Sequence, residues 1–319
     1  MPSDRPSPPS TRFRADRRRA NAALGLALLG GGLPTTAGAA AGAGRTGGRL
    51  FIIGGAEDRR GEKEVLRRFV ELCAAGRRDG PLRIAVLPAA TAFPDAGFER
   101  YDQALADLGV TERVRLAVQD RADAADPRWI AELQRVDGVL MGGGNQRRLM
   151  EVLDGSPLAA ALQQGFARRQ LCVAGSSAGA AAMSARMLVG RDVTEGLGLL
   201  PGAIVDQHFS ERRRLPRLLA AVAAQPALLG IGVDEDTGLA LSADGFDVVG
   251  SGGVTVVDAR RMAPGEAARL AAEDLEALRD HPDLRLAWLP YGTAHHPGRG
   301  RQAPALHRWL AAALQPPSD

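Results

Sequence analysis

Short apolar runs alternate with stretches of helical periodicity from Gly48 onward. The apolar runs are Leu50–Ile53, Leu82–Leu87, Val114–Val118, Val136–Met141, Leu171–Gly175 and Leu229–Val233. The stretches with helical spacing between them include Glu62–Ala75, Phe98–Leu108, Arg128–Gln134 and Pro157–Arg169. Strands that are apolar on both faces and separated by helices indicate a mainly parallel sheet that helices cover on both sides. The fold class predicted is therefore α/β.

The character of the chain changes after Glu235. Three short strands, Gly238–Ser242, Phe246–Ser251 and Val254–Asp258, are joined by glycine-rich turns. We expect them to be antiparallel and to finish the same sheet. With no internal repeat visible, the simplest organisation is one α/β domain over residues 40–319.

Residues 1–39 have the pattern of a signal peptide. Arg17–Arg19 precede the apolar run Ala20–Leu33, and a small-residue cleavage site follows at Ala37–Ala39. Consecutive arginines before a weakly apolar run are compatible with twin-arginine export. This predicts a periplasmic or extracellular protein with no membrane segment in its mature form. A Pro/Arg/Ala-rich tail is the alternative.

Charge and cysteine content argue against several function classes. The formal charge of +3 comes from the N-terminal segment, because the rest of the chain has 34 basic and 35 acidic residues. Nothing in that balance indicates a nucleic-acid partner. Cys73 and Cys172 lie in a predicted helix and strand and are expected to be core thiols. No cluster has metal-ligand spacing, so we expect neither a metal nor another cofactor.

Polar residues follow several predicted strands, where the reactive groups of parallel sheets gather. The most informative exit is Gly175-Ser176-Ser177-Ala178-Gly179, directly after an apolar run. A Gly-x-Ser-x-Gly turn between a strand and a helix raises its serine on a sharp elbow. Ser177 is therefore a candidate nucleophile, although small-residue turns also occur for packing reasons.

A base and an orienting carboxylate can be assigned from later strand exits. His208 follows the apolar segment Ala203–Val205 and can accept the proton of Ser177. Glu235, after the next strand, is the expected partner of the imidazole, with Asp234 in reserve. The order Ser–His–Glu differs from the Ser–Asp/Glu–His order of esterases. His295 and His296 could restore the esterase order, but they lie in what looks like a terminal loop.

An oxyanion hole needs backbone amides that face the attacked carbonyl. The amide of Ala178 follows the nucleophile, and the glycine run at 142–144 offers a second one, which we place at Gly144. A glycine turn before a helix could also hold phosphate. No Walker lysine follows it, and no Gly-x-Gly-x-x-Gly spacing is present, so nucleotide binding is disfavoured.

These segments resemble cyanophycinases, in the same order and from about Arg49 to Asp258. The shared motifs are Gly54-Gly55-Ala56-Glu57-Asp58, the Gly-Gly-Asn-Gln of 143–146, Gly175–Ala180, Asp206-Gln207-His208-Phe209, the spaced arginines 212, 214 and 217, and Gly230–Glu235. The Asp-Gln-His-Phe block with its spaced arginines separates cyanophycinases from the related aspartyl dipeptidases, which share the fold and the elbow.

The resemblance implies a class I glutamine-amidotransferase-like fold, often dimeric, and a serine peptidase. Its substrate would be cyanophycin, a poly-aspartate chain with arginine on each side-chain carboxylate, and its product β-Asp-Arg dipeptides. By motif position Ser177 is the nucleophile, His208 the base and Glu235 its partner. The substrate-binding residues implied are Gln146, Ser176, Asp206, Gln207, Arg212, Arg214 and Arg217.

The charged residues of these motifs suit such a substrate, but the sequence departs from the family pattern in two places. Asp206 could receive a guanidinium group, and the arginine forks could receive carboxylates. Ser176 stands where the family usually has threonine, and the segment 180–206 is shorter than expected. A related exported peptidase acting on small aspartyl peptides is therefore the alternative. An inactive anion-binding protein is a third hypothesis.

Overall fold

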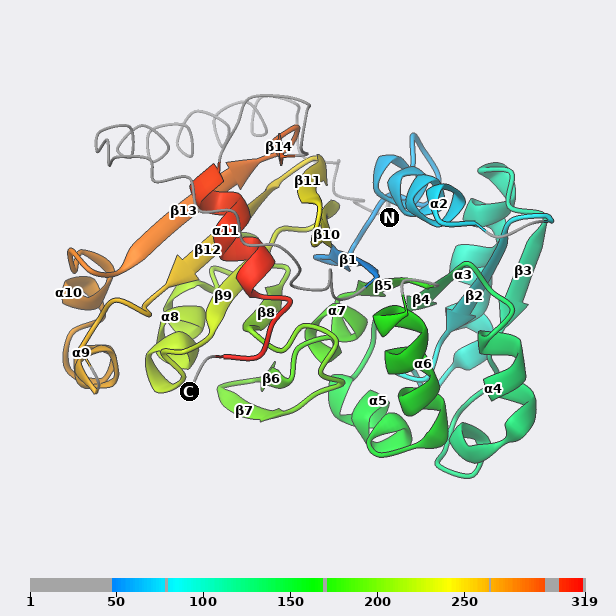
Figure 1. The fold of residues 1–319 in the computed structure, drawn as a ribbon, viewed down its shortest axis with the longest axis horizontal. Coiled ribbons are helices and arrows are strands. Elements are labelled where there is room, and N and C mark those ends of the chain that lie inside the picture. The colour runs from blue at the N-terminus through cyan, green and yellow to red at the C-terminus, as the bar shows by residue number, and fades with distance from the viewer. Residues whose placement is uncertain (1–47, 78–79, 169–170, 264, 296–303, 318–319) are drawn as a thin grey trace, which may run out of the picture. The chain divides into compact units, whose positions relative to one another are not determined.

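Two β-sheets share one apolar core in the described part of the chain (Figure 1). The computed structural model describes residues 48–77, 80–168, 171–263, 265–295 and 304–317, all within one compact unit, Gly44–Asp319. The predicted signal peptide at 1–39 and His296 lie outside these residues.

The main sheet has eight strands in the order β14-β11-β10-β1-β5-β4-β2-β3. Its parallel part consists of β1 (Arg49–Ile53), β5 (Cys172–Ser176), β4 (Gly138–Met141), β2 (Arg83–Leu87) and β3 (Glu112–Arg115). The antiparallel strands β10 (Thr237–Ser242), β11 (Gly245–Gly250) and β14 (Ala294–His295) extend it beyond β1. The predicted mainly parallel α/β sheet is confirmed.

Several strands that we expected in the main sheet form a second, four-stranded sheet. Its order is β13 (Arg285–Pro290), β12 (Gly253–Asp258), β9 (Leu229–Val233) and β8 (Ala203–Gln207). β8 and β9 are parallel, and β12 is antiparallel to β9. The expectation of a single sheet was wrong, because a strand apolar on both faces fits a second buried sheet equally well. A separate hairpin joins β6 (Arg186–Val189) to β7 (Asp192–Glu195).

Side-chain alternation divides the apolar residues into three layers. On β1, Phe51 and Ile53 face α2 (Glu64–Ala75) and α3 (Pro94–Asp107), while Leu50 and Ile52 face the core shared with the second sheet. That shared core also holds α5 (Gln146–Leu153), α6 (Pro157–Ala167), α7 (Ala178–Ala182) and the second sheet's inner face. The outer face of the second sheet packs on α8 (Leu215–Ala224), α9 (Glu266–Glu273) and α10 (Leu275–Arg279).

Helix starts follow local sequence signals. The side chains of Asp126, Asn145 and Ser156 accept backbone hydrogen bonds at the starts of α4 (Pro127–Leu133), α5 and α6. Proline occupies the first turn of α4 and α6, where its missing N–H is not needed. The last described helix is α11 (Pro304–Ala312), and a short 3₁₀ turn spans Asp123–Ala125.

Most predicted elements are present, with shifted ends. β3 begins before the apolar run at Val114–Val118, and Asp206 and Gln207 belong to β8 itself instead of following it. His295, expected in a loop, forms the two-residue strand β14. Cys73 and Cys172 are buried free thiols. Among the described helices, none is long and apolar enough to cross a membrane.

Gly54 lies where the ends of the two sheets meet. A β-carbon at this position would lie 1.9 Å from the carbonyl oxygen of Asp234, at the end of β9. Its N–H donates to the carbonyl of Thr237 (2.9 Å), and its own carbonyl accepts from the N–H of His208 (2.8 Å). The close approach of β1 to the 234–237 turn therefore requires glycine.

We expect Gly54→Ala to lower the free energy of unfolding by at least about 1–3 kcal/mol, because backbone atoms cannot move aside as a flexible side chain can. Gly165→Ala is the matched control: its new methyl would meet Leu171 at an ordinary 3.4 Å within α6. There, alanine should stabilise by up to about 1 kcal/mol. Urea unfolding of both variants measures this, and equal stabilities would contradict the analysis of Gly54.

Candidate active site

Ser177 occupies the sharp turn that the sequence predicts between β5 and α7. Its φ of 51° and ψ of −107° lie outside the regions that residues with a side chain ordinarily adopt. Two glycines permit the turn: a β-carbon on Gly175 would lie 2.4 Å from Gly179, and one on Gly179 would lie 2.3 Å from the carbonyl oxygen of Met141. Such strained positions gather at active sites.

His208 and Glu235 complete a hydrogen-bonded chain with Ser177. The Oγ atom of Ser177 lies 2.9 Å from Nε2 of His208, and Nδ1 of His208 lies 2.7 Å from Oε1 of Glu235. His208 is buried, 8% exposed, and has a φ of 49° directly after β8. The structure thus brings the three residues together as the Ser–His–Glu order requires.

The end of β1 holds all three members through its backbone. The carbonyl of Ile53 accepts from Ser177 N–H (3.0 Å), that of Gly54 from His208 N–H, and that of Gly55 from Asp236 N–H (2.9 Å), next to Glu235. Gly55 also lies against the imidazole, since a β-carbon there would be 2.5 Å from Nε2 of His208.

The alternative carboxylate, Asp234, and the alternative base, His295, have other partners. Asp234 accepts hydrogen bonds from the N–H groups of Ser210 and Gly253, both at 3.0 Å, and so fixes two loops instead of the imidazole. His295 is buried on β14, its ring 4.5 Å from that of His307. Among the described residues, Ser177 therefore pairs with His208 and not with His295, as the esterase order would require.

Backbone amides near Ser177 come from the glycine run as well as from Ala178. A β-carbon on Gly143 would lie 3.4 Å from the Ser177 β-carbon, whereas Gly144, with a φ of 146°, packs on Ala90. Within the described residues, the amides of Gly143 and Gly144 donate to no other protein group. Gly143 therefore lies close to Ser177, whereas the sequence prediction placed the second amide at Gly144.

Asp206 is fully buried and already occupied by two arginines. Its Oδ1 lies 3.1 Å from Nη1 of Arg214 and 2.5 Å from Nη2 of Arg217, and its Oδ2 accepts from Nε of Arg217 (2.8 Å). The expectation that Asp206 receives a substrate guanidinium does not fit this arrangement. Instead, Asp206 orients two arginines whose combined charge exceeds its own.

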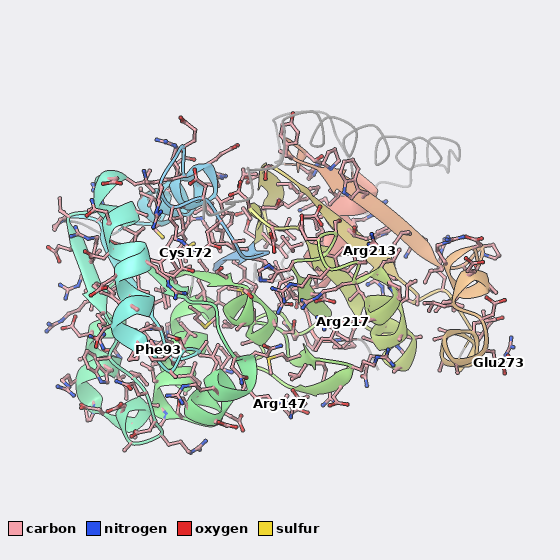
Figure 2. All side chains as sticks on the ribbon, turned by 180° about the vertical axis from the view of Figure 1, so that it is seen from behind. Phe93, Arg147, Cys172, Arg213, Arg217 and Glu273 are labelled. Atoms are coloured by element: carbon pink, nitrogen blue, oxygen red, sulfur yellow. The ribbon has the colours of Figure 1, made fainter. Side chains whose placement is uncertain are left out.

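The other residues implied by the resemblance surround this cluster. Gln146 donates to the carbonyl of Leu188 (3.3 Å), and Arg217 to that of Gly190 (3.0 Å), so both hold the β6–β7 hairpin. Figure 2 shows Arg217 and, on α5, Arg147, which also contacts the hairpin. Arg212 is exposed in the turn before α8. The side-chain oxygen of Gln207 is buried, and none of the residues that the structure describes donates a hydrogen bond to it.

Sequence analysis missed a buried carboxylate beneath the elbow. Glu57, 2% exposed, accepts from Oγ of Ser176 (2.7 Å), from the hydroxyl of Tyr101 (2.7 Å) and from Arg59 (3.0 Å). Burial, together with the Glu57 charge, raises the pKa of Tyr101, which therefore stays a donor. Ser176 is directed at Glu57, not at the site opening. The sequence could have indicated this role, because Glu57 belongs to the motif Gly54–Asp58 that directly follows β1.

The arrangement fits nucleophilic catalysis at an acyl carbon. It combines a strained serine, an imidazole within hydrogen-bond distance, a carboxylate that fixes the imidazole tautomer, and nearby free amides. Among the described residues, no group of three histidine, cysteine or acidic side chains could hold a metal ion.

We expect Ser176→Ala to slow the labelling of Ser177 by a fluorophosphonate about three- to tenfold, because it frees the elbow from Glu57. Tyr101→Phe is the matched control, since it removes a hydrogen bond of the same length from the same carboxylate but leaves the elbow tethered. Both should lower stability by about 1–2 kcal/mol. Ser176→Thr, which keeps a hydroxyl group at this position, should label at a rate close to that of the wild type. Equal labelling of the alanine and phenylalanine variants would contradict a role of Glu57 at the elbow.

Comparison with known proteins finds curated relatives that carry one name. A cyanophycinase of Trichormus variabilis is 36% identical over 271 residues, which cover 81% of this chain and 89% of the relative. One of Geminocystis herdmanii is 36% identical over 77% of this chain and 93% of its own length. One of Synechococcus elongatus is 40% identical over 67% of this chain and 69% of its own length.

The fold has a counterpart among solved structures. A peptidase from an acI-B1 actinobacterium aligns with a TM-score of 0.60 at 21% identity, covering 79% of this chain and 98% of that structure. The family model for peptidase family S51 matches residues 50–249, a stretch that contains Ser177, His208 and Glu235. The chain therefore belongs to peptidase family S51 and is a serine-type peptidase.

Proposed function

We propose that this peptidase is an exopeptidase that hydrolyses cyanophycin to β-Asp-Arg dipeptides through an acyl-enzyme on Ser177. The observation that carries the proposal is the hydrogen-bonded chain Ser177–His208–Glu235 on a strained elbow. The relatives named cyanophycinase support the substrate.

In the first half of the reaction, Nε2 of His208 takes the proton of Ser177 as Oγ bonds to the scissile carbonyl carbon. The resulting imidazolium is stabilised by Glu235 across the 2.7 Å contact at Nδ1. His208 then returns the proton to the leaving amine as the C–N bond breaks. A water molecule, deprotonated by the same imidazole, releases the acyl group and regenerates the serine.

The negative oxygen of the tetrahedral intermediate would be bound by the amides of Ala178 and of the glycine run. The second amide would be that of Gly144, as the sequence predicts, or that of Gly143, where a β-carbon would lie 3.4 Å from the β-carbon of Ser177. Preformed amide donors of this kind need no rearrangement as the charge develops.

The polar residues around the triad support an arginine-bearing and carboxylate-bearing substrate. The buried, undonated oxygen of Gln207 is suited to accept from a guanidinium group, since leaving it unpaired is costly. Arg212, Arg214 and Arg217 supply cations for the free carboxylates, with Asp206 holding the last two in place. Gln146 would contact the substrate beside the hairpin, and Ser176 would contribute indirectly through the elbow.

We further propose that residues 1–39 direct export and are removed. The support is the order of arginines, apolar run and small residues in that segment. An exported peptidase of this specificity would act on polymer released by other cells.

Incubating the protein from Ala40 onward with insoluble cyanophycin should release soluble β-Asp-Arg, identified by mass spectrometry. Ser177→Ala should abolish release while leaving the fold intact, because the substitution removes only a hydroxyl group. Circular dichroism and a thermal melt of the variant supply the control. Turnover near the wild-type rate in the variant would reject Ser177 as nucleophile.

A folded wild-type protein that releases nothing from the polymer would reject the proposed substrate. Hydrolysis of short aspartyl peptides would then favour the related peptidase activity, for which loss of the exposed Arg212 should matter little. Resistance to serine-directed labelling would favour an inactive anion-binding protein.

Glu235→Gln should lower kcat by about 10³-fold or more with little change in KM, since the amide cannot stabilise the imidazolium. Asp234→Asn is the matched control one residue away, and it should cost stability more than turnover because Asp234 binds two backbone amides. Steady-state kinetics and urea unfolding of both variants separate the effects. A change confined to KM in Glu235→Gln would transfer the role to Asp234.

A further inference from the structure

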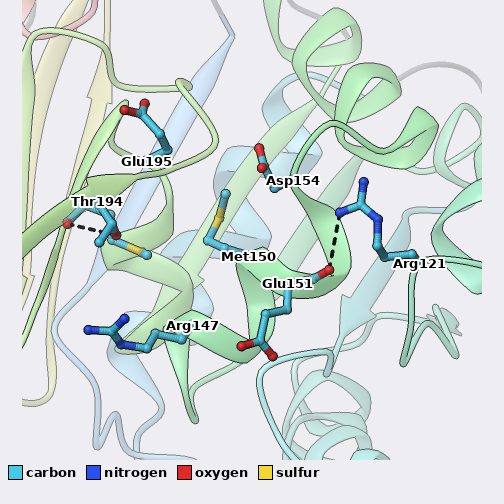
Figure 3. Close-up of a pocket in the computed structure, with 8 residues that line it drawn as sticks. Arg121, Arg147, Met150, Glu151, Asp154, Thr194 and Glu195 are labelled. Carbon is cyan, nitrogen blue, oxygen red and sulfur yellow. Dashed lines mark hydrogen bonds between the residues drawn. The ribbon is translucent and has the colours of Figure 1, made fainter.

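A cavity lies beside the β6–β7 hairpin, which Arg217 of the Asp206 cluster also contacts. It has a volume of about 330 Å³, near the lower end for ligand sites and suited to a group the size of one amino acid. Figure 3 shows it between α5 and the hairpin. Its lining residues are Arg121, Arg147, Met150, Glu151, Asp154, Met187, Thr194 and Glu195.

This cavity is joined to the candidate active site through two hydrogen bonds. Gln146 donates to Leu188, and their neighbours in the chain, Arg147 after Gln146 and Met187 before Leu188, line the cavity. Arg217 of the Asp206 cluster donates to Gly190 at the turn of the same hairpin. A chain bound at Gln146 thus has the cavity directly beside it.

The floor of the cavity is apolar. Met150 and Met187 are 8% and 1% exposed, and their flexible thioethers adapt to an aliphatic stem. A ligand that uses this floor therefore has several methylene groups, which a bare ion or a phosphate does not.

The charged side chains of the lining gather toward two ends of the hollow (Figure 3). Asp154 and Glu195 lie toward one end, with Arg121 on the Asp154 side, and Arg147 and Glu151 lie toward the other. Asp154 has no ion pair or side-chain hydrogen bond with any described residue, and Arg186 binds only Oε1 of Glu195. Arg147 pairs with Asp192 at 3.3 Å, where both side chains are more than half exposed, so a ligand carboxylate could replace Asp192 at little cost.

We propose that the cavity is an accessory subsite for an arginyl group with a free carboxylate. Its methylene stem would lie on Met150 and Met187, its guanidinium between Asp154 and Glu195, and its carboxylate on Arg147. This rests on the proposed function, because cyanophycin bears such a group on every residue. An arginyl branch next to the one held at the triad would occupy it.

The test uses the methionine methyl groups as reporters. The full chain carrying Ser177→Ala contains six methionines, and their ¹³C-methyl signals can be assigned by Met→Leu substitution. Titration with Nα-acetyl-L-arginine should shift Met150 and Met187 saturably and leave Met262, in the core of the α8–α10 layer, unchanged. Nα-acetyl-L-glutamine, which has the carboxylate without the guanidinium, should shift them weakly.

Asp154→Asn should weaken this binding about two- to fivefold, as expected for a partly exposed charge pair. Glu99→Gln, which neutralises an exposed carboxylate on α3, is the matched control. No shift at Met150 and Met187, or equal shifts with the glutamine analogue, would overturn the proposal.

Steady-state kinetics then show whether the cavity binds an arginyl group of the polymer or free arginine. With Ser177 intact, Asp154→Asn should raise KM for cyanophycin about two- to fivefold without changing kcat. Methyl shifts without any effect on KM would overturn the role in substrate binding and leave a site for free arginine. If the wild type does not cleave cyanophycin, the proposed function fails, while the titration still decides whether the cavity binds an arginyl group.

Discussion

Three consecutive carbonyl groups at the end of β1 determine the geometry of the site. Ile53, Gly54 and Gly55 accept hydrogen bonds from the amides of Ser177, His208 and Asp236, which belong to three different segments. Because backbone hydrogen bonds hold each segment, the side chains of Ser177, His208 and Glu235 meet without long flexible stems. The two glycines are required since a β-carbon at either would collide with the Asp234 backbone or the imidazole.

Charge around the triad is arranged in layers. Glu57 and Asp206 are buried carboxylates that orient other groups, one the elbow and the other two arginines. Beside these two carboxylates, Arg212 is exposed, and no described residue donates to the buried side-chain oxygen of Gln207. A buried carboxylate with all its donors in place is a rigid support, whereas the same carboxylate with a partner removed is strongly destabilising.

Periodicity and strand-exit residues were sufficient to predict the parallel strands, the elbow and the three residues joined by hydrogen bonds. They could not predict the second sheet, because β8 and β9 are apolar on both faces whichever sheet they join. Nor could they show that Asp206 is occupied, since its partners Arg214 and Arg217 looked equally available to a ligand. The link between Glu57 and Tyr101 spans 44 residues and depends on how α3 packs on β1 and β2.

The division of the site between the two sheets has a wider consequence. Ser177 follows a strand of the main sheet, whereas His208 and Glu235 follow strands of the second. The distance from Oγ of Ser177 to Nε2 of His208 therefore also depends on how the two sheets pack against each other. Val233 and Leu239 of the shared core are fully buried, and because interiors are close-packed, a small change in their volume would be transmitted to the reacting atoms. In this architecture the packing between the sheets, and not only the residues of the triad, sets the geometry of the reacting groups.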